Sequence, residues 1–376
     1  MTGPRRLGAD TPEELGIVQA AVEYAYDQDW SDGLPVVPAT RERTDAFLAT
    51  TDRHPDEVIG RLEPLRREVT VETAAVNAVM AGCRPEYFPV VLAAWDALML
   101  DPTTAVGAWQ STSGPAPLIV VNGPVRERLA LNGGGGALGP GFRANATIAR
   151  AIGLLVRNGL GVRPQVFEQA TQGIPGRWGM CLAENEEESP WEPIAVDGGL
   201  APGSDAVSAM LVRDTEFVDN RHTADPEKLL ADLADTLGRT GALIFEHAAA
   251  GLVLCPEHAQ LLARAGMAKE DVRRWLADHT RRSVADLRAV GKNGLTDLGG
   301  RGVRVDRPDE ERSGEDRVFA TDTAQHLPIL VAGARNAGIS SVVRLFTSWP
   351  RISARVESCP ADVPVPLSLV DPEVEA

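Results

Sequence analysis

The segment PLIVVNG at residues 117–123 constrains the fold of this chain more than any other stretch. It is a short apolar run bounded by proline and glycine, which predicts a buried strand. Helical spacing precedes it at 70–82, where the final glycine predicts the end of the helix, and at 85–100. A glycine-rich loop and a predicted helix at 144–157 follow it. Strands that alternate with helices predict an α/β or mixed α+β fold.

A segment rich in glycine, proline and acidic residues, 171–205, divides the chain, and its length is typical of a functional or mobile loop. We therefore expect two subdomains with a boundary near residue 200. The main domain, 1–200, holds the glycine-rich loop and the acidic loop. A second α/β subdomain, 201–376, has a predicted strand pair at 206–219, a strand leading into a helix at 327–338, and a Pro-rich tail.

The net charge of −16 excludes some partners. An acidic surface repels nucleic acid and anionic membranes, so neither is expected. The N-terminal residues lack the apolar core of a secretion signal, and no apolar run approaches the ~18 residues of a membrane span. The four cysteines form no CxxC pair, which favours reduced thiols in a cytoplasmic protein.

The loop-to-helix stretch NGGGGALGPGFRANATIAR, residues 132–150, formally contains GxGxxG at Gly134, Gly136 and Gly139. A dinucleotide-binding loop leaves its strand directly and is followed about 20 residues later by an acid. Here GPVRERLALN separates loop from strand, the acid is missing, and no GK[ST] is present. NAD, FAD and ATP are therefore not expected. Two interpretations stay open: the loop and Arg143 hold a small anion at a helix start, or the glycines permit tight packing.

Cys83 lies in GCRPEY, between one predicted helix and the proline that starts the next. A thiol at a helix start beside Arg84 is expected to have a lowered pKa, which predicts a nucleophile or a redox thiol. The alternative is a small buried residue at a helix–helix corner.

Two further segments combine thiols with acids or histidine. Cys255 precedes His258 by three residues, which suits a nucleophile and its base but also an ordinary helix start. Cys181 precedes the acidic run Glu184 to Glu188, which predicts either a solvated face or, with a thiol or histidine, a divalent metal site. The alternative metal ligands are Cys83, Cys181, Glu184 and His258.

Several motifs together resemble a bacterial family that is found with, or fused to, UGSC domains, which carry a cysteine or selenocysteine in a Sec-Gly-Ser-Cys-type motif. The motifs are DWSDGLPVVPAT (29–40), TVETAAVNAVMAGCRPEYFPVVLAA (70–94), APLIVVNGP (116–124), GPGFRANATIARA (139–151), CLAENEEESPWEP (181–193) and LCPEHAQLLARAGMAKEDVRRWL (254–276). The resemblance covers roughly residues 26–280. The chain has no CGSC or UGSC motif, and Glu357-Ser358-Cys359 does not replace it. A UGSC-type partner subunit would then supply the motif, or the chain acts alone or as a homo-oligomer.

The resemblance directs attention to polar positions within these motifs. They are Trp30, Asp32, Glu72, Asn77, Cys83, Glu86, Asn122, Arg143, Asn145, Cys181, Glu184, Asn185, Glu187, Trp191 and His258.

Our leading hypothesis is a bacterial enzyme of small-molecule metabolism, a lyase or a thiol-dependent transferase or oxidoreductase, acting on a carboxylate or acyl thioester. The expected catalytic residues are Cys83, Glu187, Glu184, His258 and Cys181. Cys83 would be the nucleophile or redox thiol, and Glu187, Glu184 or His258 would act as the acid/base group. The expected substrate-binding residues are Arg143, Asn145, Asn122, Trp30, Asp32, Glu86, Trp191, Gly136 and Gly139. The alternatives are a metal-dependent lyase or hydrolase and a non-catalytic subunit that partners a UGSC-type redox protein.

Overall fold

The computed structural model describes residues 12–105, 107–175, 179–244, 249–292, 316–318 and 326–357. The helices in this part are α1 (Pro12–Asp27), α2 (Arg41–Leu48), α3 (Val71–Ala81), α4 (Phe88–Met99), α5 (Pro102–Ala105), α6 (Val125–Arg128), α7 (Arg143–Leu154), α8 (Ile194–Asp197), α9 (Pro226–Leu237), α10 (Pro256–Arg264), α11 (Lys269–His279) and α12 (Val284–Ala289). Single turns precede α4 at η2 (Pro85–Tyr87) and extend α7 at η4 (Leu155–Gly159).

The strands in the described residues are β1 (Val58–Leu62), β2 (Arg67–Thr70), β3 (Ala116–Asn122), β4 (Met180–Ala183), β5 (Ala206–Asp219), β6 (Ala250–Leu254), β7 (Arg281–Ser283), β8 (Asp316–Val318), β9 (Ile329–Val331), β10 (Ile339–Leu345) and β11 (Ala354–Arg355). Seven of them form one mixed sheet in the order β4-β3-β5-β10-β6-β9, with β11 added on β5. The expected mixed α/β architecture is confirmed. The predicted boundary near residue 200 falls between β4 and β5, and both strands belong to this sheet.

The two halves of the sheet repeat one topology. In the first half, β3 pairs in parallel with β4 and antiparallel with β5. In the second half, β6 pairs in parallel with β9 and antiparallel with β10. The antiparallel β5–β10 pair joins the halves at the centre. Helices make the crossover in each parallel pair, as parallel strands require.

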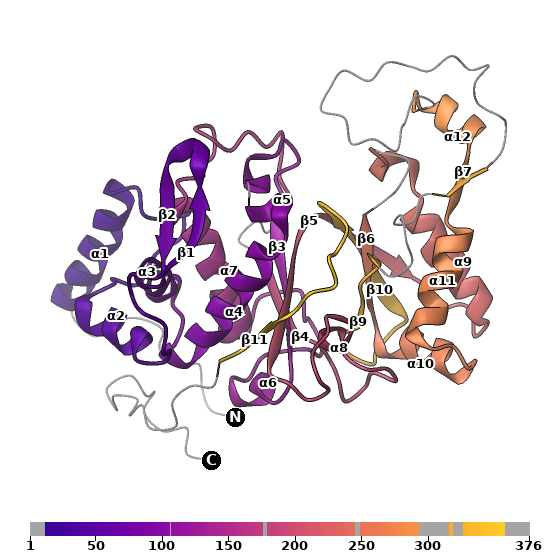
Figure 1. The fold of residues 1–376 in the computed structure, drawn as a ribbon, viewed down its shortest axis with the longest axis horizontal. Coiled ribbons are helices and arrows are strands. Elements are labelled where there is room, and N and C mark those ends of the chain that lie inside the picture. Colours follow the sequence, from indigo (N-terminus) through magenta and orange to yellow (C-terminus); the bar gives the residue numbers. More distant parts are fainter. Residues whose placement is uncertain are drawn as a thin grey trace.

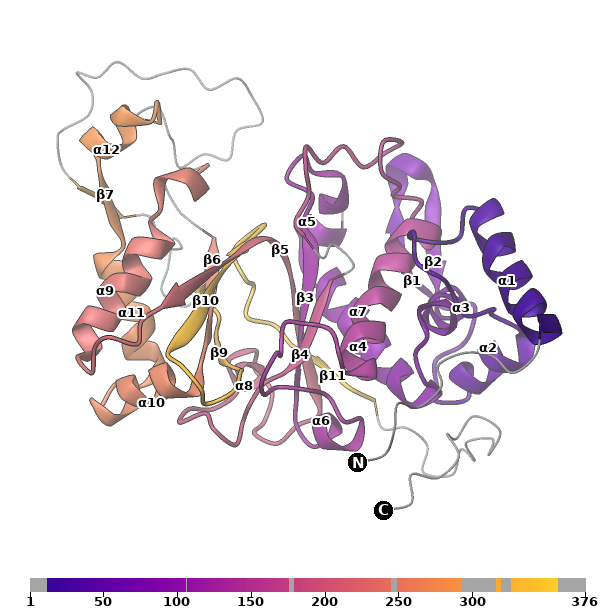
Figure 2. The ribbon, with the colours of Figure 1, turned by 180° about the vertical axis from the view of Figure 1, so that it is seen from behind.

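Helices cover the outer side of each half, and Figure 1 shows the indigo and purple helices at one end and orange α10 and α11 at the other. Figure 2 shows the same arrangement from behind. Side chains alternate between faces along a strand. In β3, Ile119 packs under the N-terminal helices and Leu118 belongs to an inner core. In β6, Leu252 packs under α9 to α11 and Val253 joins the same inner core.

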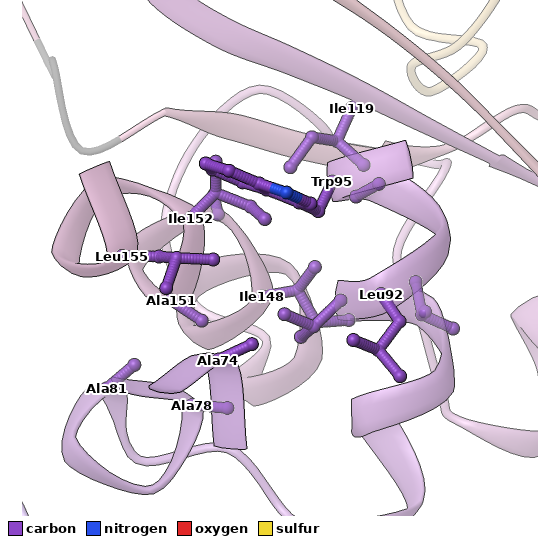
Figure 3. Packing of buried hydrophobic residues seen from close by; sticks show 14 of the residues in the cluster. Ala74, Ala78, Ala81, Leu92, Trp95, Ile119, Ile148, Ala151, Ile152 and Leu155 are labelled. Carbon is purple, nitrogen blue, oxygen red and sulfur yellow. The ribbon is translucent and has the colours of Figure 1, made fainter. Parts of the chain in front are cut away.

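Small side chains bring α3 close to α7. Ala74 and Ala78 of α3 are fully buried beside Ile148 of α7, while Trp95 of α4 packs between α7 and Ile119 (Figure 3). Gly82 ends α3 in a left-handed conformation (φ 91°) that glycine adopts without strain, which confirms the predicted glycine stop. This helix pair positions the residues around Cys83.

The edges of the sheet meet at the ends of β4 and β9, so the sheet closes into a half-barrel. The backbone N–H of Asn185 donates to the carbonyl oxygen of Val331 at 2.8 Å, and that of Gly333 donates to Gly133 at 2.8 Å. These bonds join segments that lie far apart in the sequence and place the glycine-rich loop at the junction.

Three local predictions were wrong. Residues 206–219 form one long strand, because the polar part 214–216 continues to pair with β10 instead of turning. The segment after β9 does not become a helix: the chain turns at Gly333 (φ 108°) and returns as β10. The loop 171–205 contains β4 and α8. In the described part of the chain, no helix combines the length and the apolar character needed to cross a membrane.

Candidate functional site

A cavity of about 200 Å³ lies between the end of α3 and the start of α7, and Cys83 lines it. After Gly82 the chain turns, and Pro85 starts the single turn η2. Arg143, the first residue of α7, donates from Nε to the Gly82 carbonyl oxygen at 3.0 Å and lines the same cavity. The structure therefore brings together Cys83 and Arg143, two residues that the sequence proposed for one site. We call this space the Cys83 cavity.

Burial determines the protonation state of Cys83. The residue is 6% exposed, and burial raises the pKa of its thiol to about 12. The Thr147 hydroxyl and the guanidinium groups of Arg143 and Arg150 favour the thiolate, but they offset only part of this effect. The predicted lowering of the pKa was therefore wrong. The sequence does not show the depth of burial, and η2 is too short to supply the field of an α-helix.

Three arginines line the Cys83 cavity. They are Arg43, Arg84 and Arg143, and they accompany an apolar wall that includes Val37 and Phe47. Arg43 donates to the Pro38 carbonyl oxygen at 3.1 Å, and within the described residues neither Arg43 nor Arg143 forms an ion pair with a carboxylate. Guanidinium groups without a carboxylate partner are suited to bind an anion.

The glycine-rich loop lies elsewhere, at the end of β4. A Cβ on Gly133 would come within 2.4 Å of the Ala183 carbonyl oxygen, so this glycine is required for close packing. Gly136 and Gly139 form a turn closed by a 2.8 Å backbone bond. Asn145 fastens the loop: its Oδ1 accepts from the Asn132 backbone N–H, and its Nδ2 donates to two backbone carbonyls, each at 2.9 Å. Of the two open interpretations, these contacts favour tight packing.

Glu184 is fully buried at the junction of the sheet edges. Its Oε2 accepts from Asn122 Nδ2 and from the backbone N–H of Ile194, each at 2.8 Å. Its Oε1 accepts from the backbone N–H of Val331 at 3.4 Å. Burial raises the pKa of this carboxyl group, partly offset by Lys269 and by the donors. Glu184 thus connects the two halves of the sheet.

Glu187 lies nearby on Arg126, which it contacts through both carboxylate oxygens at 2.9 and 3.2 Å. Arg126 is largely buried, and its Nη1 also donates to the Glu184 carbonyl oxygen at 2.8 Å. The hydrogen bonds from Arg126 hold the pKa of Glu187 below its usual range. A base near neutral pH needs a higher pKa, so this geometry does not favour the predicted acid/base role.

His258 lies in the C-terminal half, where both its ring nitrogens are engaged. Nε2 contacts the Asn220 carbonyl oxygen at 2.9 Å, which places a proton on Nε2, and Nδ1 contacts Ser340 Oγ at 2.8 Å. Ser340 Oγ also lies 3.7 Å from Cys255 Sγ. His258 is buried, and burial raises the pKa of the Cys255 thiol. The contacts give His258 and Cys255 a structural role in joining β6 and β10.

The remaining predicted residues have structural contacts. Asp32 pairs with Arg150 at 2.7 Å and so ties the loop before α2 to α7. Trp191 donates from Nε1 to the Met267 carbonyl oxygen at 3.0 Å. Cys181 packs in the N-terminal core, where burial raises its thiol pKa. Glu86 lies 3.9 Å from Arg84 and is not among the residues lining the Cys83 cavity.

Trp30 lies at a second cavity and is 43% exposed. Its ring meets that of Tyr24 edge to face, with 5.6 Å between the centroids. Cys359 lies outside the described residues.

The predicted composite site is therefore divided among several places. Within the described residues, no group of three or more His, Cys, Asp and Glu side chains could hold a metal ion, and so Cys83, Cys181, Glu184 and His258 do not form the alternative metal site.

Sequence reasoning missed two residues beside Cys83. Arg43 comes from α2, and no local signal connects it with Cys83. Thr147 lies one turn after Arg143 on α7, so helical spacing could have found it.

No protein-family model, curated protein or solved structure matches this chain. The resemblance to the UGSC-associated family stays a prediction.

Proposed function

We propose that this chain is an enzyme of small-molecule metabolism and that it binds a small anionic substrate, a carboxylate or acyl thioester, in the Cys83 cavity. One observation carries the proposal: Arg43 and Arg143, which have no carboxylate partner in the described part of the chain, line the same cavity as Cys83. In a protein with a net charge of −16, such a space is a local exception that attracts anions.

The arginines supply binding, and the thiol supplies the chemistry. Cys83 is the one nucleophilic side chain among the residues that line the cavity. Its pKa of about 12 keeps it protonated in the free protein, so it donates a hydrogen bond to a bound anion. Ionising this thiol at pH 7.5 costs about 6 kcal/mol, since one pKa unit corresponds to about 1.4 kcal/mol. A covalent step therefore requires the substrate to take up the thiol proton.

Calorimetric titration with acetate, butanoate and inorganic phosphate tests the binding site. A charged hydrogen bond contributes about 1.5–3 kcal/mol, so Arg143→Ala and Arg43→Ala should each weaken binding about tenfold or more. Arg264 is an exposed arginine on α10, so Arg264→Ala is the matched control and should bind these anions as the wild type does. Binding should weaken as salt concentration rises. Absence of binding, or equal binding in all four proteins, would show that the cavity is not an anion site.

The role of the thiol is tested with Cys83→Ser and Cys83→Ala. Serine keeps a hydrogen-bond donor of similar size, so Cys83→Ser should retain anion binding, while Cys83→Ala should bind more weakly. If a screen of carboxylates and acyl thioesters finds turnover, both variants should lose it. Turnover that survives in Cys83→Ala would exclude the thiol from the chemistry.

A further inference from the structure

A second, apolar cavity of about 430 Å³ lies next to the Cys83 cavity. Its floor is the face of α3 that carries Val76 and Met80, and its sides are the segment Val36–Thr40 and α1. Cavities of this size commonly hold small ligands. We call this space the Trp30 cavity.

The mouth of the Trp30 cavity exposes large apolar side chains. Tyr24 is 56% exposed, Trp30 43% and Val37 37%. Aromatic residues make up only 5% of the chain, so two of them at one opening are a distinct feature. Rings held in place at the rim of an apolar cavity offer contact area with little loss of side-chain entropy.

The amide donors in the wall are engaged within the protein, whereas Asn158 Oδ1 is buried without a hydrogen-bond partner among the described residues. Asn77 is 2% exposed; its Nδ2 donates to the Thr73 carbonyl oxygen at 2.8 Å, and its Oδ1 accepts from Asn158 Nδ2 at 2.9 Å. Asn158 also donates to the Trp30 carbonyl oxygen at 2.9 Å, which fixes the Trp30 loop. The rest of the wall is mainly apolar, so it is suited to a hydrocarbon or aromatic group.

The two cavities are adjacent through Val37, which lines both. The backbone N–H of Val37 donates to the Met80 carbonyl oxygen at 3.1 Å, so this shared wall is fixed to the end of α3. On one side of Val37 the lining is apolar, and on the other it carries Arg43 and Arg143. The polarity thus changes from apolar to cationic across a single residue.

We infer that the substrate is an amphipathic carboxylate that extends across Val37, with its anionic group in the Cys83 cavity and its apolar body in the Trp30 cavity. The inference rests on the proposed function and specifies its substrate class. The charge of one cavity selects the head of the molecule, and the apolar lining of the other selects the tail.

A chain-length series tests it on the full-length protein: calorimetry with acetate, butanoate, hexanoate and octanoate, and with hexan-1-ol as the uncharged control. Affinity should rise about fourfold for each methylene group that enters the cavity. Hexan-1-ol should bind at least tenfold more weakly than hexanoate. If acetate and butanoate bind but longer carboxylates bind no more tightly, or if hexan-1-ol binds as well as hexanoate, the inference is wrong, whereas the proposed anion site is unaffected. If no anion of any length binds, the proposed function itself fails.

Val76→Phe, which fills the Trp30 cavity, should abolish the gain with chain length and leave acetate binding unchanged. Ala39→Leu on the opposite wall provides a second, smaller obstruction in case Val76→Phe does not fold. Val58 is a partly exposed valine outside both cavities, so Val58→Phe is the matched control and should keep the full increase of affinity with chain length. A gain that persists in both cavity variants would place the tail elsewhere. If analytical ultracentrifugation shows a dimer for the wild type and a monomer for Val76→Phe, with unchanged ligand affinity, the Trp30 cavity is a contact between copies of the chain. That result, or a chain-length gain in affinity that persists in both cavity variants, overturns the inference.

Discussion

Replacing Glu184 by alanine tests how the two sheet edges are held together. The carboxylate accepts hydrogen bonds from Asn122 Nδ2 and from the backbone N–H groups of Ile194 and Val331. The bond to Val331 is long at 3.4 Å, so two donors carry most of the effect. Leaving a buried donor unpaired costs about 1–3 kcal/mol, and Glu184→Ala should therefore lower the free energy of unfolding by about 2–6 kcal/mol.

The loss is a large part of the stability of a typical protein, about 5–15 kcal/mol. Urea unfolding followed by circular dichroism and tryptophan fluorescence measures it, and both signals should shift together because the edges belong to one sheet. Glu188→Ala is the control, since Glu188 lies on the surface with Arg335 and should change stability little. If Glu184→Ala is no less stable than Glu188→Ala, the buried carboxylate does not connect the edges.

Burial and packing also determine how pH, alkylation and glycine substitutions affect the protein. Because burial raises the pKa of Glu184, the folded state binds the proton of this carboxyl group more tightly than the unfolded state does. The free energy of unfolding of the wild type, relative to that of Glu184→Gln, should therefore fall as pH rises above the unfolded-state pKa of about 4.3. A difference between the two proteins that does not change with pH in urea titrations would contradict the raised pKa. Cys83, with a pKa of about 12, has a thiolate fraction of about 10⁻⁴ at pH 8, against about a quarter for an ordinary thiol. Peptide mapping after iodoacetamide treatment should therefore show that Cys83 is alkylated about a thousandfold more slowly in the folded protein than in urea. Similar rates in the two conditions would refute the argument from burial. Gly133→Ala should reduce the melting temperature more than Gly136→Ala does. A Cβ at position 133 would meet a carbonyl oxygen at 2.4 Å, whereas a Cβ at position 136 would have open space and only an unfavourable φ of 71°. A larger reduction in Gly136→Ala would show that the loop packs differently.

Individual helices and strands could be predicted where the local pattern of apolar residues and glycines determines the secondary structure. The apolar run at 117–123 is β3, and the helical spacing with a glycine stop at 70–82 is α3. Pairing between distant segments was not visible: β5 reads as two strands because its polar part pairs with β10, and β9 is too short to be distinguished from the start of a helix. The repeated topology of the two halves has no fixed period in the sequence, because their connections differ in length.

The candidate site was predicted in part. Cys83 and Arg143 occupy one cavity, although the sequence connected Arg143 with the glycine-rich loop and gave Cys83 a lowered pKa. Both errors have one cause: residue type and neighbours in the sequence indicate charge, but burial and long-range contacts decide what a group does. Glu184 shows this most clearly, since a carboxylate predicted to be catalytic has all its contacts within the protein.

In the proposed binding mode, the Cys83 cavity holds the carboxylate of an amphipathic substrate. Anomalous diffraction from crystals grown with 4-bromobenzoate tests this binding mode, because bromine marks the position and orientation of the ligand. We predict a carboxylate beside Arg43 and Arg143 and a bromine peak on the other side of Val37, in the Trp30 cavity, with the occupancy of both reduced in Arg143→Ala. A bromine peak elsewhere in the protein, or none in either cavity, would contradict the claim.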